Sequence, residues 1–409
     1  MGDLMKTQHV GMTIGLYIDY LLLGMINIIF SSNMSFLTTQ LNTDNTGISI
    51  LVSGIGIGKL ITLSVSGRLS DKFGRKPLVV TASFLYLLFL IGIPLSATYE
   101  IAFIFAIIAG ISNSILDSGA YPALIEAFPK NPGISTVLIK ASISVGAMIL
   151  PILISFIINH NIFYGYSFFI LAFIFFINGS FLSSVRFPKN TNKNNEEIIN
   201  KGYRFKTKPN IWLEGLATIF MGFTTTTLFM VVQVWLPTYG LNKLEMSRTE
   251  SIQLLSYFNI GSLISVLILA FVINRFVSPI LILILYPFLT SLSLLILLFC
   301  QQPSLLIISS FLIGFSTAGL FQLCITVIVE FFPKNKATIS AYVSTASSSA
   351  FIVIPYITGL FVKNIGVTAV FWLDFIIALI SIILATYVYY RYKKVFKKSV
   401  ISSRLSKAS

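Results

Sequence analysis

Long apolar segments alternate with short polar ones along the whole chain. Each apolar segment has about 20 residues or more, the length that an α-helix needs to cross the hydrocarbon core of a bilayer. Proline, glycine or clustered charged residues separate neighbouring segments. The pattern predicts twelve membrane-spanning helices, over residues 11–36, 46–68, 77–96, 99–127, 133–159, 163–184, 209–238, 250–273, 277–299, 303–331, 337–361 and 366–390.

Composition supports a membrane protein. Of the 409 residues, 56% are apolar and only 10% are charged, whereas a soluble domain carries about 25% charged residues. The first apolar segment is longer than the hydrophobic part of a signal peptide, so we interpret it as a retained span. The predicted fold class is an all-α membrane protein, which excludes a large soluble enzyme.

The basic residues predict the orientation. With a cytoplasmic N-terminus, the inward-facing segments carry 23 of the 28 lysines and arginines. Basic residues concentrate in cytoplasmic loops, so both chain ends are expected in the cytoplasm and the protein in the plasma membrane. The formal charge of +14 is then explained by the basic residues of the cytoplasmic loops, which also attract anionic lipid. No nucleic-acid partner is expected.

The two halves of the chain repeat one another. The segment EAFPKN at residues 126–131 recurs as EFFPKN at 330–335, and the same offset of 204 residues relates Gly110 to Gly314 and Pro151 to Pro355. Such duplication is typical of transporters. It predicts two pseudo-symmetric six-helix bundles at 1–185 and 209–391, with a cytoplasmic linker at 186–208 and a basic cytoplasmic tail at 392–409.

One cytoplasmic loop is unusually charged. In GRLSDKFGRKP, residues 67–77, glycines would allow a close helix approach at Gly67 and a tight turn at Gly74, and the bases would lie against anionic lipid. The loop resembles the signature Gly-x-x-x-Asp-(Arg/Lys)-x-Gly-Arg-(Arg/Lys) of the major facilitator superfamily. The residues that carry this loop are Gly67, Arg68, Asp71, Lys72, Gly74, Arg75 and Lys76.

The resemblance implies a fold and a mechanism. Members of this superfamily are twelve-helix carriers that operate by alternating access, and the loop latches the two halves together when the carrier opens outward. Asp71 would then be a gate residue that pairs near the start of span eleven. The alternative is that the loop only sets topology. Glu126 and Glu330, which close spans four and ten, are expected in the cytoplasmic gate network with Arg75 and Lys76.

Ionisable residues at membrane depth are costly and therefore candidates for function. Asp19, Lys59 and Asp117 lie about 12, 15 and 18 Å from the cytoplasmic face at 1.5 Å per residue, which predicts one central cavity. Lys59 would pair with Asp19, or be shared with Asp117, in a proton-coupling arrangement. The alternative is a static pair between Asp19 and Lys59. Around Asp117, the stretch ILDSGAYPALIE is similar to the fourth span of the fucose/proton symporter branch, although that branch has Glu at the acid position and lacks Lys59.

Other polar residues carry weaker signals. Lys140 and Glu214 lie near the cytoplasmic ends of their spans and can reach the surface, and the sequence assigns no role to Asp374. Amides and aromatic rings within the spans suit a small polar solute, although Tyr and Trp often mark membrane interfaces instead. The substrate-binding candidates are Tyr17, Asn27, Asn113, Tyr121, Gln233, Trp235, Asn259 and Gln322.

Uptake by proton symport and export by proton antiport both fit this scaffold. The run GAMILPILIS at 146–155 lacks the full Gly-x-x-x-Gly-Pro-x-x-Gly-Gly motif of drug/proton antiporters, which favours uptake of a sugar or a similar compound. No catalytic or metal-binding pattern is present, so no enzyme activity, metal or cofactor is expected beyond the proton gradient. A receptor or a channel remains a remote alternative. The expected partners are a small-molecule substrate, protons and the lipid bilayer, and the expected unit is a monomer.

Overall fold

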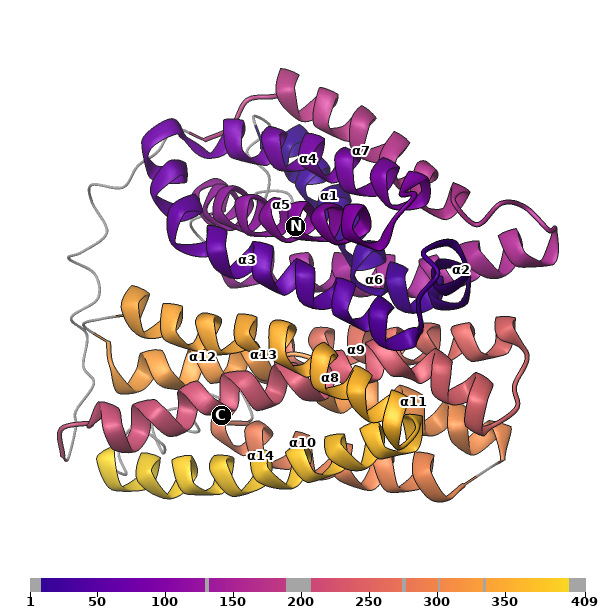
Figure 1. The fold of residues 1–409 in the computed structure, drawn as a ribbon. Coiled ribbons are helices and arrows are strands. Elements are labelled where there is room, and N and C mark those ends of the chain that lie inside the picture. Colours follow the sequence, from indigo (N-terminus) through magenta and orange to yellow (C-terminus); the bar gives the residue numbers. More distant parts are fainter. Residues whose placement is uncertain are drawn as a thin grey trace. The chain divides into compact units, whose positions relative to one another are not determined.

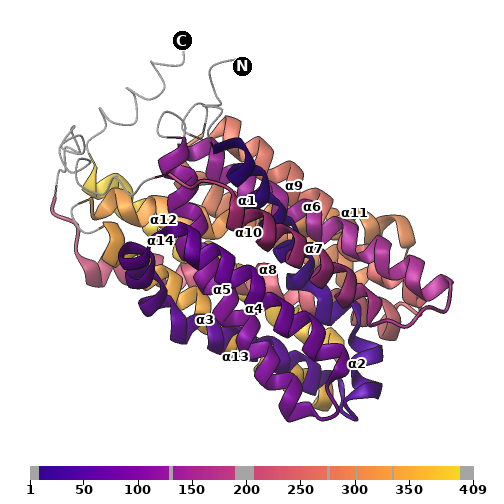
Figure 2. The same cartoon turned by 90° about the horizontal axis from the view of Figure 1, so that it is seen from above.

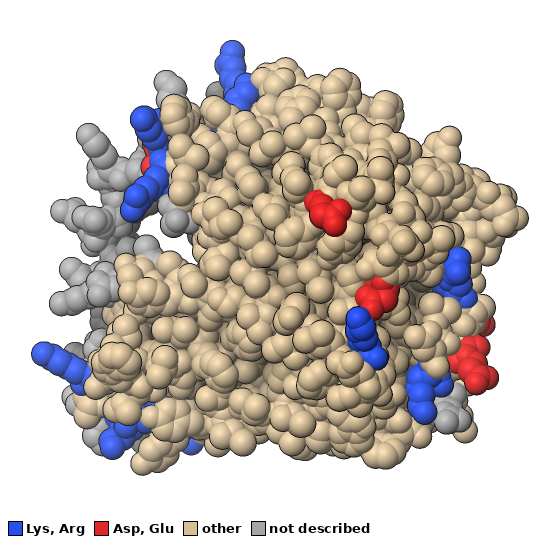
Figure 3. Space-filling view, viewed as in Figure 1, with Lys and Arg blue, Asp and Glu red and all other residues tan. Residues whose placement is uncertain are grey.

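The protein is almost entirely helical. The computed structural model describes residues 9–128, 132–188, 207–273, 277–300, 302–333 and 336–396. Within these residues, twelve helices are long and apolar enough to cross a membrane, which confirms the expected number. Figure 3 shows few charged side chains on one face of the protein and a broad area without them.

The first-half helices correspond closely to the predicted spans. Their bounds are α1 Val10–Ser32, α2 Met34–Gln40, α3 Asn45–Phe73, α4 Arg75–Leu95, α5 Tyr99–Ala127, α6 Pro132–Asn159 and α7 Tyr166–Ser184 (Figure 1). The first span ends four residues earlier than expected, at Ser32 rather than at 36. Asn33 follows it, and its side-chain amide donates hydrogen bonds to the Ile29 carbonyl (3.0 Å) and to Ser167 Oγ (3.2 Å). The short helix α2 begins directly afterwards.

The second-half helices include a break within span ten, between α11 and α12, that the sequence pattern does not predict. A π-helical turn, η3 Ile211–Gly215, precedes the remaining helices: α8 Leu216–Lys243, α9 Arg248–Val272, α10 Pro279–Phe299, α11 Pro303–Thr317, α12 Leu320–Phe331, α13 Lys336–Asn364 and α14 Val367–Val395. Span ten consists of α11 and α12, because Gly319 between them adopts a left-handed conformation with φ of 78°. The helix related to it by the repeat, α5, is continuous.

Contacts divide the chain into two compact units. Unit 1 contains residues Met1–Thr191, Gln233–Ile260 and Phe351–Val370, and unit 2 contains Asn192–Val232, Gly261–Ala350 and Phe371–Ser409. Parts of α8, α9 and α13 therefore pack with the first-half helices. Within unit 1, α5 packs against both α3 and α4, and Figure 2 shows these three helices side by side.

The charged loop forms a sharp turn between α3 and α4. Gly74 has a φ of 89° and a ψ of 170°, a backbone conformation that is open essentially only to glycine. The tight turn expected at this residue is thus confirmed. The close helix approach expected at Gly67 is wrong, because among the described residues a methyl group there would meet nothing within 4 Å.

The two glycines should therefore respond differently to alanine. We expect Gly74→Ala to destabilise the protein by about 1–3 kcal/mol through backbone strain. Gly67→Ala should leave stability unchanged or raise it by up to about 1 kcal/mol, because alanine is the better helix former. Melting temperatures of the two variants in detergent, followed by tryptophan fluorescence, measure the difference. Equal melting of Gly74→Ala and the unmodified protein would contradict the assigned turn.

Candidate functional site

An ion pair between α3 and α5 forms the centre of the candidate site. The two helices cross closely, because Cβ atoms added at Gly58 and Gly110 would lie only 2.1 and 2.0 Å from carbonyl oxygens of the facing helix. Lys59 directly follows Gly58, and Asp117 lies two helical turns after Gly110. Lys59 Nζ is 3.6 Å from Asp117 Oδ2, and the two side chains remain 27% and 31% exposed. The pair is therefore only partly buried.

Two tyrosines complete the surroundings of Asp117. The hydroxyl of Tyr20, a fully buried residue of α1, donates a hydrogen bond to Asp117 Oδ1 over 2.9 Å. Its ring packs edge-on against that of Tyr121, with 5.7 Å between the centroids. Both carboxylate oxygens of Asp117 thus have a partner, one cationic and one neutral. An aromatic wall beside an ion pair is a common arrangement in sites for small organic molecules.

Lys140 belongs to the same electrostatic environment. This half-buried residue of α6 interacts electrostatically with both Asp117 and Lys59. Lys140, which the sequence places near the cytoplasmic end of its span, therefore also contributes positive charge near Asp117. Two lysines face one aspartate, so the cluster carries a net positive charge when all three residues are ionised.

Asp19 lies in a different network from the one expected. Its carboxylate accepts hydrogen bonds from Asn178 Nδ2 (2.7 Å) and Ser83 Oγ (3.1 Å), and the residue is fully buried. Among the described residues, Lys59 forms its ion pair with Asp117 and none with Asp19. The expected pairing of Asp19 with Lys59 is wrong, because the carboxylate faces α4 and α7. Asp19 instead connects three helices of the first half.

Helix α3, which carries Lys59, also contacts α13 within unit 1. Three hydroxyl groups of α3 donate to α13 carbonyls: Thr46 to Gly359 (2.9 Å), Ser49 to Pro355 (2.9 Å) and Ser53 to Ile352 (2.8 Å). We call this row of contacts the α3–α13 seam. Asp44 and Lys363 approach within 3.9 Å at one end of it. At the other end, Lys59 Nζ lies 6.0 Å from the centre of the Phe351 ring.

Arg75 is the central residue of the charged loop. Its guanidinium donates to Asp71 Oδ1 (2.8 Å), Ser70 Oγ (2.7 Å) and Glu126 Oε1 (3.1 Å). The arginine side chain is only 5% exposed, and that of Glu126 is 12% exposed. The sequence expectation that Glu126 and Arg75 share a network is confirmed. Arg68, Asp71 and Lys72 are exposed, Lys76 is half-buried, and the role of Asp71 as a latch stays a prediction.

The other substrate candidates differ in their burial and in their hydrogen-bond partners. Trp235 Nε1 donates to Thr358 Oγ1 (2.8 Å), and Asn259 Nδ2 donates to the Leu255 carbonyl (2.7 Å). Tyr17 donates to the Ser135 carbonyl (3.3 Å). Gln233 and Asn113 are buried, Asn27 is exposed, and Gln322 is half-buried in unit 2. Tyr17, Trp235 and Asn259 therefore form hydrogen bonds with their own or a neighbouring helix, and Tyr121 lies beside Tyr20 at the pair.

Unit 2 has its own buried acids. Glu214 is fully buried and accepts a hydrogen bond from Arg391 Nε over 2.8 Å. The expectation that Glu214 reaches the surface is therefore wrong. Glu330 accepts one from the Tyr392 hydroxyl over 2.7 Å. Asp374 is fully buried, and neither of its carboxyl oxygens has a hydrogen-bond partner in the part of the chain that the structure describes. In that same part, no cluster of His, Cys, Asp and Glu could hold a metal ion.

Comparisons with known proteins agree with this architecture. The sequence model of the Major Facilitator Superfamily matches residues 16–302 and 242–405. YfkL of Bacillus subtilis (strain 168), described as an uncharacterized MFS-type transporter, is 48% identical over 95% of this chain and 98% of its own. The inner membrane transport protein YdiN of Escherichia coli (strain K12) is 38% identical over 93% of this chain and 90% of its own.

A solved structure is also similar to this one. The crystal structure of a D-xylose-proton symporter superposes with a TM-score of 0.74 and covers 93% of this chain and 97% of the symporter. The sequence identity is only 16%, so this likeness shows the fold alone.

The charged loop allows a matched test of burial. We expect Arg75→Gln to destabilise the protein by about 3–5 kcal/mol, because it leaves Glu126, whose side chain is only 12% exposed, without its cation. Arg68→Gln removes an exposed charge from the same loop and should change stability by less than about 0.5 kcal/mol. Melting in detergent compares the two variants. Equal losses would show that net charge, rather than the buried contact, stabilises the loop.

Asp19 and Asp374 should differ although both are fully buried. Asp19→Ala removes the acceptor of the Asn178 amide, which should cost about 1–3 kcal/mol more than Asp374→Ala. Asp374→Ala leaves no hydrogen-bond donor without its acceptor among the described residues. Melting curves of the two alanine variants give the difference directly. A larger loss for Asp374→Ala would mean that this carboxyl group has a strong partner.

Proposed function

Because the chain belongs to the major facilitator superfamily, a family of membrane transporters, we propose that it carries a small polar organic solute into the cell together with protons. The proposed cycle is alternating access, with the Lys59–Asp117 pair as the coupling site. The single observation that supports this most is the 3.6 Å ion pair, which is partly exposed and lies within membrane-spanning helices. The protein would act as a monomer in the plasma membrane, with both chain ends in the cytoplasm.

The coupling step follows from the chemistry of the pair. A carboxylate beside an ammonium group stays ionised, whereas a carboxylate that loses its cation in a low-dielectric surrounding takes up a proton. A solute that draws Lys59 away from Asp117 would therefore favour protonation of the acid. The Tyr20 hydroxyl, at 2.9 Å from Asp117 Oδ1, keeps the carboxyl group in place while Lys59 changes partner.

The composition of the site supports a polar solute with acceptor groups. Lys59 and Lys140 offer hydrogen-bond donors and positive charge, and Tyr121 offers an aromatic face. Hydroxyl, carbonyl or carboxylate oxygens of a solute would satisfy the lysines. Sugars and small hydroxylated acids both meet this description. The sugar named for the similar solved structure is that protein's own and does not select between them.

The charged loop would close the cytoplasmic side. In this proposal Asp71, which is exposed and paired with Arg75 over 2.8 Å, is the member of the loop that would exchange partners near the start of span eleven. Arg75 and Glu126 hold the loop against α5 and stay together throughout the cycle. The gate role of Glu330 is proposed by analogy, because it occupies the equivalent position of the repeat.

Proton flux into proteoliposomes tests the function and the coupling site together. The purified protein is reconstituted with the pH indicator pyranine inside, and a panel of pentoses, hexoses and hydroxy acids is added outside. We expect at least one solute to acidify the lumen, and Asp117→Asn to abolish this signal. Lumen alkalinisation on addition of a solute would indicate exchange in opposite directions, as in an antiporter.

Glu100→Gln is the matched control. Glu100 is an exposed acid in the first turn of α5, the helix that carries Asp117, and its substitution should leave the proton signal unchanged. Radiolabelled uptake of the active solute is measured in parallel. Uptake without acidification would contradict proton coupling, and unchanged acidification in Asp117→Asn would contradict the assigned site.

A further inference from the structure

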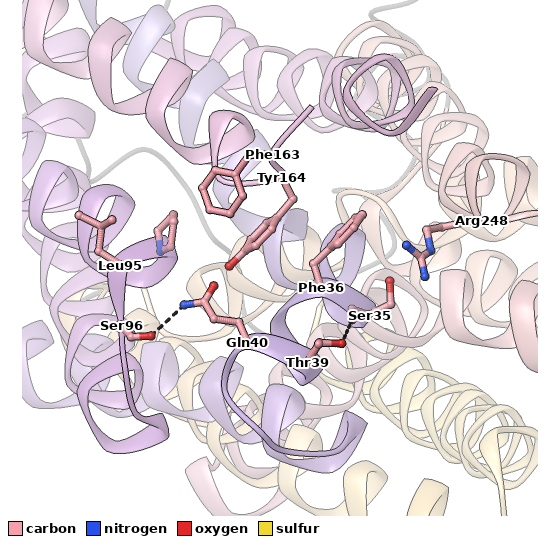
Figure 4. A pocket seen from close by; sticks show the side chains of 10 residues that line it. Ser35, Phe36, Thr39, Gln40, Leu95, Ser96, Phe163, Tyr164 and Arg248 are labelled. Carbon is pink, nitrogen blue, oxygen red and sulfur yellow. Dashed lines mark hydrogen bonds between the residues drawn. The ribbon is translucent and has the colours of Figure 1, made fainter. Parts of the chain in front are cut away.

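A cavity of about 450 Å³ lies in unit 1 away from the charged loop. Residues of helix α2, the end of α4, the connection between α6 and α7 and the start of α9 line it, and it is open on one side (Figure 4). The orientation predicted from the basic residues puts this end of the helices outside the cell. The cavity shares no residue with the Lys59–Asp117 pair, and its volume lies within the usual range of about 300–1,000 Å³ for sites that bind small molecules.

Two buried polar atoms in the cavity have no partner. Tyr164 is only 7% exposed, and its hydroxyl forms no hydrogen bond with the described residues. Gln40 Oε1 is likewise unpartnered. In Figure 4 these two side chains point toward one another across the cavity. Buried polar groups are nearly always hydrogen-bonded in native proteins, so both atoms are positioned for a bound molecule.

The orientation of the Gln40 amide is fixed. Its Nε2 donates hydrogen bonds to the carbonyls of Ser96 (2.9 Å) and Ile93 (3.1 Å), which leaves Oε1 as an acceptor in the cavity. Burial raises the pKa of Tyr164 to about 12, so its hydroxyl keeps its proton at neutral pH. A hydroxyl group on a ligand would satisfy both atoms, because it can donate to Gln40 and accept from Tyr164.

Aromatic rings form the walls of the cavity. Phe36 and Tyr164 are stacked with 5.3 Å between centroids and an interplanar angle of 4°. Phe163 packs edge-on against Tyr164 at 5.0 Å. Flat aromatic walls favour a planar apolar body, which can stack on or pack edge-on against them.

The cavity also carries one positive charge. The guanidinium of Arg248, at the start of α9, lies 4.8 Å from the centre of the Phe36 ring. Among the described residues Arg248 forms no ion pair, and no acidic side chain lines the cavity. An arginine stacked on an aromatic ring keeps its donors available for a carboxylate.

We propose that this cavity is a second ligand site, which binds a small aromatic carboxylate with a hydroxyl group. The carboxylate pairs with Arg248, the ring lies against Phe36 and Tyr164, and the hydroxyl bridges Tyr164 and Gln40. Arg248 comes from the second half of the sequence and the other contacts from the first. A bound ligand therefore contacts both α9 and α2 and would stabilise their packing in unit 1. The site does not depend on which solute the protein carries.

Calorimetric titration of the full chain in lipid nanodiscs tests this proposal with 4-hydroxybenzoate as the probe. Benzoate lacks the hydroxyl group and 4-hydroxybenzamide lacks the charge. We expect both analogues to bind at least about 5-fold more weakly than the probe, since each loses one hydrogen-bonded contact. Arg248→Gln should weaken binding of the probe by about 10-fold or more. Tyr164→Phe should weaken binding of 4-hydroxybenzoate and leave binding of benzoate unchanged. A general loss of packing would weaken the binding of both.

Two control variants make the outcome decisive. Lys243→Gln removes an exposed positive charge at the C-terminal end of α8. This variant should leave binding of the probe unchanged. Lys59→Gln should also leave it unchanged, and loss of binding there would place the probe in the central site instead. Absence of binding up to about 10 mM, or equal affinities for the three probes, would overturn the proposal. Size-exclusion profiles confirm that each variant is folded.

Discussion

The low dielectric of the membrane requires that an ionised group within a span has a partner, and this constraint organises the protein. Lys59 with Asp117, Arg75 with Glu126 and Arg391 with Glu214 are all pairs between residues of different helices. Each pair therefore fixes the relative position of two segments that are distant in sequence. The pairs differ in exposure: Glu214 is fully buried, whereas Lys59 and Asp117 remain about one third exposed. A pair that solvent can reach is the one that can exchange partners.

Helix α3 links the candidate site to the packing around it. This helix provides the hydroxyl groups of the α3–α13 seam and, further along, Lys59. Phe351 of α13 lies near the Lys59 ammonium group at 6.0 Å. A displacement of α13 would therefore change the surroundings of the lysine directly. Under the proposed cycle, conformational change and the charge state of the site are connected through a single helix.

The sequence predicted the elements well. Apolar segments gave all twelve spans, and counting residues placed Lys59 and Asp117 at similar depths. Depth does not determine the direction in which a side chain points, because rotation of a helix about its axis depends on packing against its neighbours. Asp19 was therefore assigned to Lys59, although its carboxylate faces Ser83 and Asn178. For the same reason the sequence did not predict the electrostatic interaction of Lys140 with Asp117. The break at Gly319 was also missed, since glycine is common within continuous membrane helices.

The α3–α13 seam has a consequence for the balance between conformations. Hydrogen bonds between membrane helices are worth about 0.6 kcal/mol each on average, so three hydroxyl-to-carbonyl bonds hold the seam with only about 2 kcal/mol. That energy corresponds to a population ratio of about thirty, and a solute needs only a similar preference in affinity to reverse it. The donors of the seam are serine and threonine, which can also bond to carbonyls of their own helix, as Ser49 already does with Thr46 (2.8 Å). Separation of the two helices therefore strands few polar groups, and the contact can form and break at low cost.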